Sequence, residues 1–212
     1  MKNKKYSSSA FTLSEVLITL SIIGIIASIT IPTLLQDKKE QELKTTYKKM
    51  YSTLSQATIK LAADSGGTLK GDKDFANRFS KYLNVARICT ALQAQGNCWH
   101  KTGEYKYLNG SPAPAHGSEA SMVLNDGSFI FFGNRSETCT TTLYDVPDCA
   151  IIWIDTNGFK KPNMYGKDIF KIHLMETGIK PIGIPEDSIN PKTDCSATGT
   201  GSACGYKILT EQ

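Results

Sequence analysis

The sequence predicts an α+β protein in which a long N-terminal helix precedes an antiparallel β-sheet. Two observations lead to this prediction. The first is an almost continuous apolar run from Phe11 to Leu35, followed by an amphipathic pattern that continues to about residue 63. The second is a series of short, β-branched or aromatic segments separated by turn sequences after residue 119. Helical periodicity followed by strand periodicity indicates that helix and sheet are segregated along the chain.

The N-terminal segment has the length and flanking charge of a membrane span. Residues 1–10 carry Lys2, Lys4 and Lys5, and the run from Val16 to Leu35 contains no charged residue. As a helix these 20 residues would extend about 30 Å, the thickness of the hydrocarbon core. Basic residues before the span predict a cytoplasmic N-terminus and an exported C-terminal domain.

A cleaved secretory signal is the alternative interpretation of the same segment. Residues 16–26 form an apolar stretch of suitable length, and Ala27 and Ser28 would supply small residues at a cleavage site. The apolar run continues past this point to Leu35, however, and the carboxylate of Glu15 lies where a secretory signal requires apolar residues. Both features favour a retained membrane helix.

Residues 10–16, AFTLSEV, resemble the processing site of type IV prepilins and of the pseudopilins of type II secretion. The resemblance implies that a prepilin peptidase cuts between Ala10 and Phe11, that Phe11 is then N-methylated, and that the glutamate, here Glu15, stays with the mature protein. Most members of the family have glycine where this chain has Ala10. The implied parts are a leader at residues 1–10, a transmembrane and assembly helix at 11–35, and a pilin-like globular domain at 36–212. That domain includes an amphipathic helix at 36–64 and a C-terminal sheet.

The same resemblance implies a structural role and its partners. The chain is expected to be a subunit of a type IV pilus-like or type II secretion filament, and no enzyme. Its partners would be other pilin-like subunits, the prepilin peptidase, an inner-membrane assembly platform and, before assembly, membrane lipid. The expected location is a single-pass position in the inner membrane, then a periplasmic or cell-surface filament. The alternative is a secreted or membrane-tethered, disulfide-bonded binding protein that does not polymerise.

Three residues of the apolar helix have predicted roles. A carboxylate inside a bilayer is costly, so Glu15 is expected to pair with the amine that cleavage creates on Phe11, in its own chain or in a neighbour. Pairing with a neighbour would fix the axial register between subunits, the best-attested use of a buried ion pair. Gly24 and Pro32 lower helix stability and are predicted breaks.

After the apolar segment the chain predicts a second helical half and then a short helix. Residues 36–63 place Leu43, Tyr47, Leu54 and Leu61 on one face, and Ser65-Gly66-Gly67 ends the helix. The spacing of aromatic and aliphatic residues in 72–85 predicts a second helix. Residues 99–118 are rich in Gly, Ser and Pro and are expected to form an irregular connection.

Strands are predicted from residue 120 onward. Residues 120–124 and 128–132 flank Asn-Asp-Gly, a strong hairpin signal. Residues 150–155, AIIWID, are apolar and β-branched and predict a central strand. Residues 168–174 and 179–184 predict two more strands.

Six cysteines form three pairs that are local in the sequence: Cys89 with Cys98, Cys139 with Cys149, and Cys195 with Cys204. None is in a C-x-x-C motif, which argues against a zinc or thioredoxin-type site. An exported domain with an even cysteine count favours disulfides, and short loops close at the lowest entropic cost. The alternative is six reduced thiols in a cytosolic protein.

The stretch from Asp155 to Asp168 is similar to a segment common in pseudopilins. Asp155, Asn157 and Asp168 would supply oxygen ligands for Ca²⁺, although the spacing is not that of an EF-hand. The other interpretation is an Asx turn that joins two strands. The sequence favours the turn, and otherwise predicts no cofactor.

Charge and motif content disfavour catalysis and nucleic-acid binding. The formal net charge is +4, and without the three lysines of residues 1–10 it falls to +1. Segment 100–107 mixes lysines with aromatic residues, but an ordinary solvated loop is favoured over a DNA-binding one. His100, His116 and His173 are expected to be surface residues, and alternation places His173 on the solvent face of its strand. The sequence contains no hydrolase, zinc or phosphate-binding motif.

Overall fold

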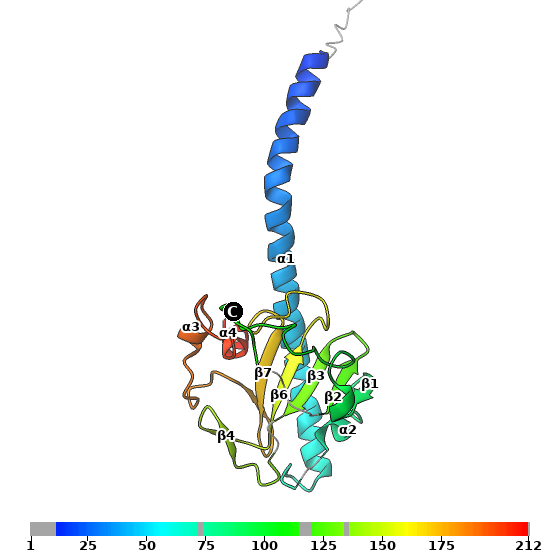
Figure 1. Ribbon diagram of the computed structural model, residues 1–212, viewed down its shortest axis with the longest axis vertical. Helices are drawn as coiled ribbons and strands as arrows, with labels where there is room; N and C mark the ends of the chain where they lie inside the picture. Colours follow the sequence, from blue (N-terminus) through cyan, green and yellow to red (C-terminus); the bar gives the residue numbers. More distant parts are fainter. Residues whose placement is uncertain (1–11, 72–73, 115–119, 134–135, 212) are drawn as a thin grey trace, which may run out of the picture. The chain divides into compact units, whose positions relative to one another are not determined.

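The computed structural model describes residues 12–71, 74–114, 120–133 and 136–211. The chain divides into two compact units, Met1–Gln41 and Glu42–Gln212. Helix α1 (Leu13–Asp64) contributes residues to both units, and a six-stranded antiparallel sheet forms the centre of the second (Figure 1). The predicted α+β class, with a long N-terminal helix and an antiparallel sheet, is confirmed.

In the first unit, α1 exposes its apolar side chains. Val16 is 41% exposed and Leu13 is 78% exposed, and the other large aliphatic residues up to Leu35 lie between these values. This is the helix in the described residues that is long and apolar enough to cross a membrane. The helix continues through Pro32 without interruption, so a helix break at this residue is not observed.

The hydroxyl groups of this segment bind the helix's own backbone. Thr19, Ser21 and Ser28 donate to the carbonyl oxygens three or four residues earlier, at 2.8 to 2.9 Å. Thr30 and Thr33 make the same kind of bond, at 3.0 and 2.9 Å. Such back-bonding satisfies each hydroxyl without a partner outside the helix, which makes these residues compatible with an apolar environment.

The second unit is built on a sheet with strand order β1-β2-β3-β6-β7-β8. The strands are β1 (Val85–Cys89), β2 (Ser121–Leu124), β3 (Phe129–Gly133), β6 (Ala150–Asp155), β7 (Ile169–Leu174) and β8 (Ile179–Pro181). Every neighbouring pair is antiparallel. A separate hairpin contains β4 (Thr141–Leu143) and β5 (Val146–Asp148).

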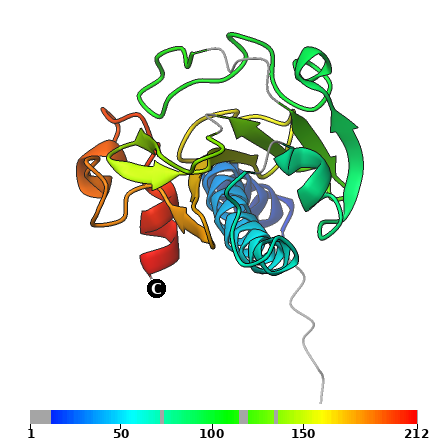
Figure 2. The ribbon, with the colours of Figure 1, turned by 90° about the horizontal axis from the view of Figure 1, so that it is seen from below.

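Both faces of the sheet are covered. On one face Tyr47, Met50 and Leu54 of α1 pack with residues of β3, β6 and β7. On the other face Trp99 and Tyr105, from the long connection between β1 and β2, pack against aromatic and aliphatic side chains of the same strands. Figure 2 shows the sheet between α1 and the green segment of this connection. Residues 150–155 and 169–174 are therefore buried at every position.

Several predicted elements need correction. The helix expected at residues 72–85 is shorter, because α2 ends at Phe79 and Val85 already belongs to β1. Strand β1 is not predicted by the sequence, and the strand expected at 179–184 stops at Pro181, whose nitrogen cannot donate to a ladder. The remaining helices are α2 (Phe75–Phe79), η1 (Ala91–Gln93), α3 (Pro191–Asp194) and α4 (Cys204–Thr210).

The cysteines are all paired within the second unit. Disulfides join Cys89 to Cys98, Cys139 to Cys149, and Cys195 to Cys204. These are the local pairs that the spacing favours. The third one closes the loop between α3 and α4. Asp194 braces that loop by accepting hydrogen bonds from the backbone amides of Thr200 and Ala203, at 2.9 and 2.8 Å.

Candidate functional site

Glu15 lies in the first turn of α1, where it binds Thr12. The backbone N–H of Thr12 and its hydroxyl both donate to Glu15 Oε2, each at 2.8 Å. In return the backbone N–H of Glu15 donates to Thr12 Oγ1 at 3.3 Å. This reciprocal pattern is a capping box, which satisfies backbone donors at a helix N-terminus that have no partner within the helix.

Thr12 is therefore a capping residue at the candidate site that the sequence analysis did not predict. The signal is present in the sequence, because Thr12-Leu13-Ser14-Glu15 has the T-x-x-E spacing of a capping box directly before an apolar run. Its presence gives Glu15 a partner inside the uncleaved chain. The carboxylate is also favourably placed with respect to the helix dipole, whose positive end lies at this terminus.

The residues of the predicted cut, Ala10 and Phe11, lie outside the described residues. Residues 5–31 match the family model of the prokaryotic N-terminal methylation motif. The chain carries the N-terminal signature of type IV pilins and pseudopilins. This signature includes Ala10, Phe11, Glu15 and Gly24, and it ends just before Pro32.

Comparison with curated proteins and with solved structures gave no match. The pilin signature therefore concerns the N-terminal segment, and the architecture of residues 42–211 comes from the structure alone. In the apolar helix Gly24 has open space on its Cα, because an added Cβ would meet nothing within 4 Å. Nothing in the helix itself requires glycine at this position.

The loop between β6 and β7 is closed by Asp155 and Asp168. Asp155 Oδ1 accepts from the backbone amides of Asn157 and Gly158, at 2.9 and 2.7 Å. The two oxygens of Asp168 accept from the amides of Met164 and Asn163, each at 2.7 Å. The carboxylates thus hold the turn together as Asx-type acceptors. Gly158 has φ +64°, and a Cβ there would collide with the carbonyl oxygen of Gly127.

These contacts bear directly on the suggested calcium ligands. The second oxygen of Asp155 contacts His100 Nε2 at 2.7 Å, so all four carboxylate oxygens of Asp155 and Asp168 already have a protein partner. The amide oxygens of Asn157 and Asn163 are buried without a hydrogen bond. In the part of the chain that is described, no group of three His, Cys, Asp or Glu residues is placed to hold a metal ion. The geometry fits the Asx-turn interpretation without a cation.

Burial perturbs both carboxyl groups of the loop. Desolvation and the neighbouring charge of Asp155 raise the pKa of Asp168 to about 7. Desolvation also raises the pKa of Asp155, although hydrogen bonds from His100 and from the amides of Asn157 and Gly158 oppose it. The loop therefore gains a proton more readily than an exposed pair of aspartates.

His173 is completely buried, which contradicts its predicted position on a solvent face. Its Nδ1 lies 2.9 Å from Asp148 Oδ1, and its Nε2 lies 2.9 Å from Asp187 Oδ1. Burial alone would lower the pKa of His173, but the two carboxylates outweigh it and raise the pKa to about 9. The imidazolium joins β5, β7 and the turn after β8, and the residues it binds leave it no free ring nitrogen for catalysis.

His100 and its neighbours also differ from the prediction of a surface loop. His100 is 2% exposed and packs among Tyr105, Phe129 and Phe159. Tyr105 is buried, and Tyr107 is half-buried against Tyr165. The aromatic rings of segment 100–107 thus belong to the hydrophobic cluster on the face of the sheet opposite α1. They are not presented for stacking on DNA bases. His116 lies outside the described residues.

Proposed function

We propose that this chain is a filament subunit of the type IV pilus or type II secretion kind, made as a membrane-held precursor. One observation carries the proposal: the N-terminal methylation motif at residues 5–31 overlaps an exposed apolar helix long enough to cross a bilayer. A helix of this kind has no covering of its own and needs lipid or like helices around it. Filament assembly would surround the helix with the like helices of neighbouring subunits.

In the proposed sequence of events, Glu15 exchanges partners. Before cleavage it caps α1 through Thr12. The cut after Ala10 creates an amine on Phe11, one residue from Thr12, and this positive group attracts the same carboxylate. Pairing with the amine of a neighbouring subunit then sets the axial step of the filament. The exported domain forms the outer surface, and its disulfides suit an oxidising compartment.

The alternative is a membrane-tethered binding protein that does not polymerise. One observation favours it: the second unit contains an open groove of about 810 Å³ lined by Lys49, Arg87, Asp126, Phe129 and Phe159, among others. This volume is sufficient for a small ligand or a peptide side-chain cluster. The two functions differ in their mature N-terminus and in whether the protein forms filaments.

The N-terminus of the mature protein is the first test. Intact-mass measurement and N-terminal sequencing of protein purified from its own cells should give Phe11 as the first residue with one added methyl group. A chain that begins near Ser28 would instead identify a cleaved secretory signal and would exclude the pilin proposal.

Variants at Glu15 separate its two roles. Glu15→Ala should abolish filaments while the amount of protein in the membrane stays the same, as measured by electron microscopy and immunoblotting. Glu15→Gln is the matched control, because glutamine can still complete a capping box but carries no charge. We expect Glu15→Gln to fail in assembly as well. Normal filaments from Glu15→Gln would show that only the cap matters and would refute amine pairing.

A further inference from the structure

Two loops of the second unit form a basic surface, hereafter the lysine surface, made of residues 100–106 and 156–167. Together they contain five lysines and one glutamate, so their net charge equals the +4 of the whole chain. The loops are joined through their backbones: Lys106 N donates to Asn163 O at 3.0 Å, and Tyr165 N donates to Lys106 O at 2.9 Å. The lysines of the surface, all exposed, are Lys101, Lys106, Lys160, Lys161 and Lys167.

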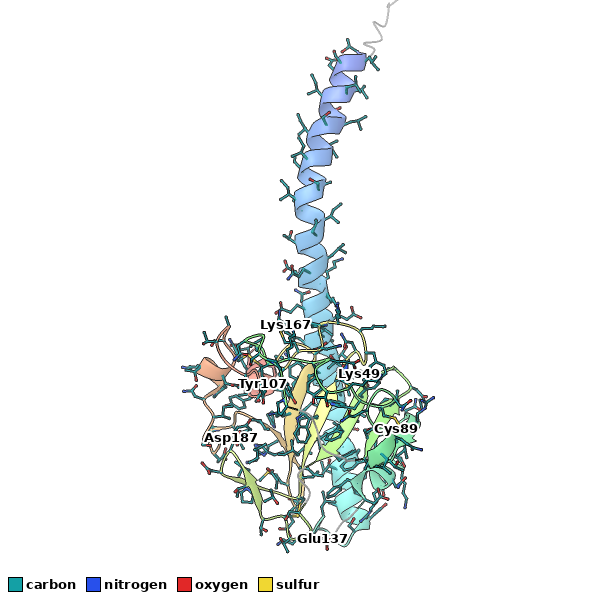
Figure 3. The ribbon with its side chains drawn as sticks, in the orientation of Figure 1. Lys49, Cys89, Tyr107, Glu137, Lys167 and Asp187 are labelled. Atoms are coloured by element: carbon teal, nitrogen blue, oxygen red, sulfur yellow. A yellow bond between two sulfur atoms is a disulfide. The ribbon has the colours of Figure 1, made fainter. Side chains whose placement is uncertain are left out.

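Within the described part of the chain, three of the five lysines of this surface lack a carboxylate partner. Among the described residues, Lys106, Lys160 and Lys167 form no ion pair with a carboxylate, whereas Lys70 and Lys180 each have one. The two aspartates that flank the β6–β7 loop are fully buried and directed to the loop's own amides. Figure 3 shows Lys167 at the edge of the domain.

An aromatic ring protrudes within the same loop. Phe159 is 48% exposed, although one side of the ring rests against Phe129 at a centroid distance of 4.6 Å. It directly precedes Lys160 and Lys161. An exposed aromatic residue next to lysines is a combination that enters the headgroup region of a bilayer. The ring lies at the boundary with the acyl chains, and the cations contact lipid phosphates.

The chain keeps this domain close to a bilayer. Six residues separate Leu35, the end of the apolar run, from Glu42, the first residue of the second unit. Even fully extended, that connection spans no more than about 25 Å. On the proposed function, on which this step rests, the domain is therefore held within reach of lipid headgroups throughout its time as a precursor.

From these observations we propose that the lysine surface binds anionic phospholipid headgroups of the membrane that holds the precursor. Single-stranded DNA would use the same charges, but it also needs successive exposed aromatic faces for stacking. Tyr105 and Tyr165 are buried, and Phe159 is the one large aromatic side chain among the described residues that is exposed. The geometry thus favours a lipid surface, where attraction depends on charge density and falls with salt.

The test uses the full chain, inserted through its own helix into nanodiscs of phosphatidylcholine alone or of phosphatidylcholine with phosphatidylglycerol. Acetylation rates of individual lysines are measured by mass spectrometry. At Lys160 and Lys167 we expect acetylation about fivefold slower in the anionic discs, the factor that corresponds to one lysine contact with an anionic surface. High salt should abolish the difference. Lys81 and Lys192, exposed outside the lysine surface, are the internal controls.

Charge-reversal variants give the matched comparison. Lys160→Glu with Lys167→Glu should remove the lipid-dependent protection of Lys106, whereas Lys81→Glu with Lys192→Glu, the same change in net charge, should leave it. Equal rates in both lipids, or protection that appears only when single-stranded DNA is added, would overturn the proposal. A chain that does not remain in the discs would overturn the membrane-held precursor as well, whereas retention without protection would refute the lysine surface alone.

Discussion

The helical segment up to Gln41 and the domain that follows it differ in where their apolar side chains lie. In the first unit the large aliphatic residues are exposed, and the hydroxyls bond to their own helix. In the second unit both faces of the sheet are covered, and buried charged side chains have hydrogen-bond partners within the domain, as at His173, Asp168 and Lys171. The domain thus completes its packing alone, while the segment requires an external apolar environment.

The difference predicts where substitutions act. Changes in the second unit should alter the free energy of unfolding, because they disturb contacts made within the chain. Changes in the first unit should alter assembly or local helix stability and leave the fold of the domain intact. The predictions below test this division, from the largest expected effect to the smallest.

Removal of the buried imidazole should have the largest effect. His173→Ala leaves Asp148 and Asp187 buried without their cation, and breaking such a buried network costs about 3–5 kcal/mol of unfolding free energy. Urea unfolding followed by near-UV circular dichroism measures it. Lys180→Ala, which removes an exposed pair with Glu186, is the control and should change stability by less than about 1 kcal/mol. A similar loss from both variants would contradict the importance of the buried network.

The stability of the domain should also depend on alkaline pH. The pKa of His173 is raised from 6.5 to about 9, so its contribution is complete below pH 6.5 and is lost as the pH rises through 9. Lys171, whose pKa burial lowers to about 8, acts in the opposite direction over a similar range, which makes the net effect smaller than that of truncation. The contribution of His173 is the difference between the melting temperatures of the native chain and of His173→Gln, measured at each pH across this range. If that difference did not change with pH, His173 would not be a buried imidazolium.

Loss of the helix cap should have a smaller and local effect. Thr12→Val removes the hydroxyl that binds Glu15, at a cost of about 1 kcal/mol in the first turn of α1. Hydrogen exchange of residues 13–18 in detergent should accelerate, while the melting temperature of the domain stays constant. Thr12→Ser keeps the cap and is the matched control. Faster exchange throughout the domain would mean that the two units are not energetically separate.

Chelation should have no effect. Because each carboxylate oxygen of Asp155 and Asp168 already has a hydrogen-bond partner in the protein, we expect the same melting temperature with EDTA and with added Ca²⁺. A higher melting temperature with calcium would instead support calcium binding by Asp155, Asn157 and Asp168. Asp168→Asn would then identify whether the loop is responsible.

The sequence predicts the parts of the fold that depend on local pattern. The amphipathic half of α1, the central strand at residues 150–155 and the turn at residues 125–127 are all in place. The error at His173 comes from the assumption that alternate residues of a strand face water. Residues 99–114 form the expected irregular connection. They also cover the second face of the sheet, and a pattern within one strand does not reveal such long-range coverage.

The site residues also differ in whether the sequence could predict them. Glu15 stands out in the sequence because a charge inside an apolar run is costly, and the capping partner Thr12 follows from a known spacing. Asp148 and Asp187 do not stand out as partners of His173, because they lie 25 and 14 residues away along the chain and meet it only in the folded domain. Local chemistry is readable from the sequence, and convergence of distant segments is not.

The back-bonded hydroxyls of the first unit have a consequence for reversibility. A helix that has already satisfied its own polar groups exchanges only dispersion contacts when its surroundings change from acyl chains to the side chains of like helices. No hydrogen bond must break in either direction. Because its polar groups need no partner outside the helix, the same segment could leave a bilayer and return to it. The equilibrium between lipid and filament would then depend on the few charges at the ends of the segment.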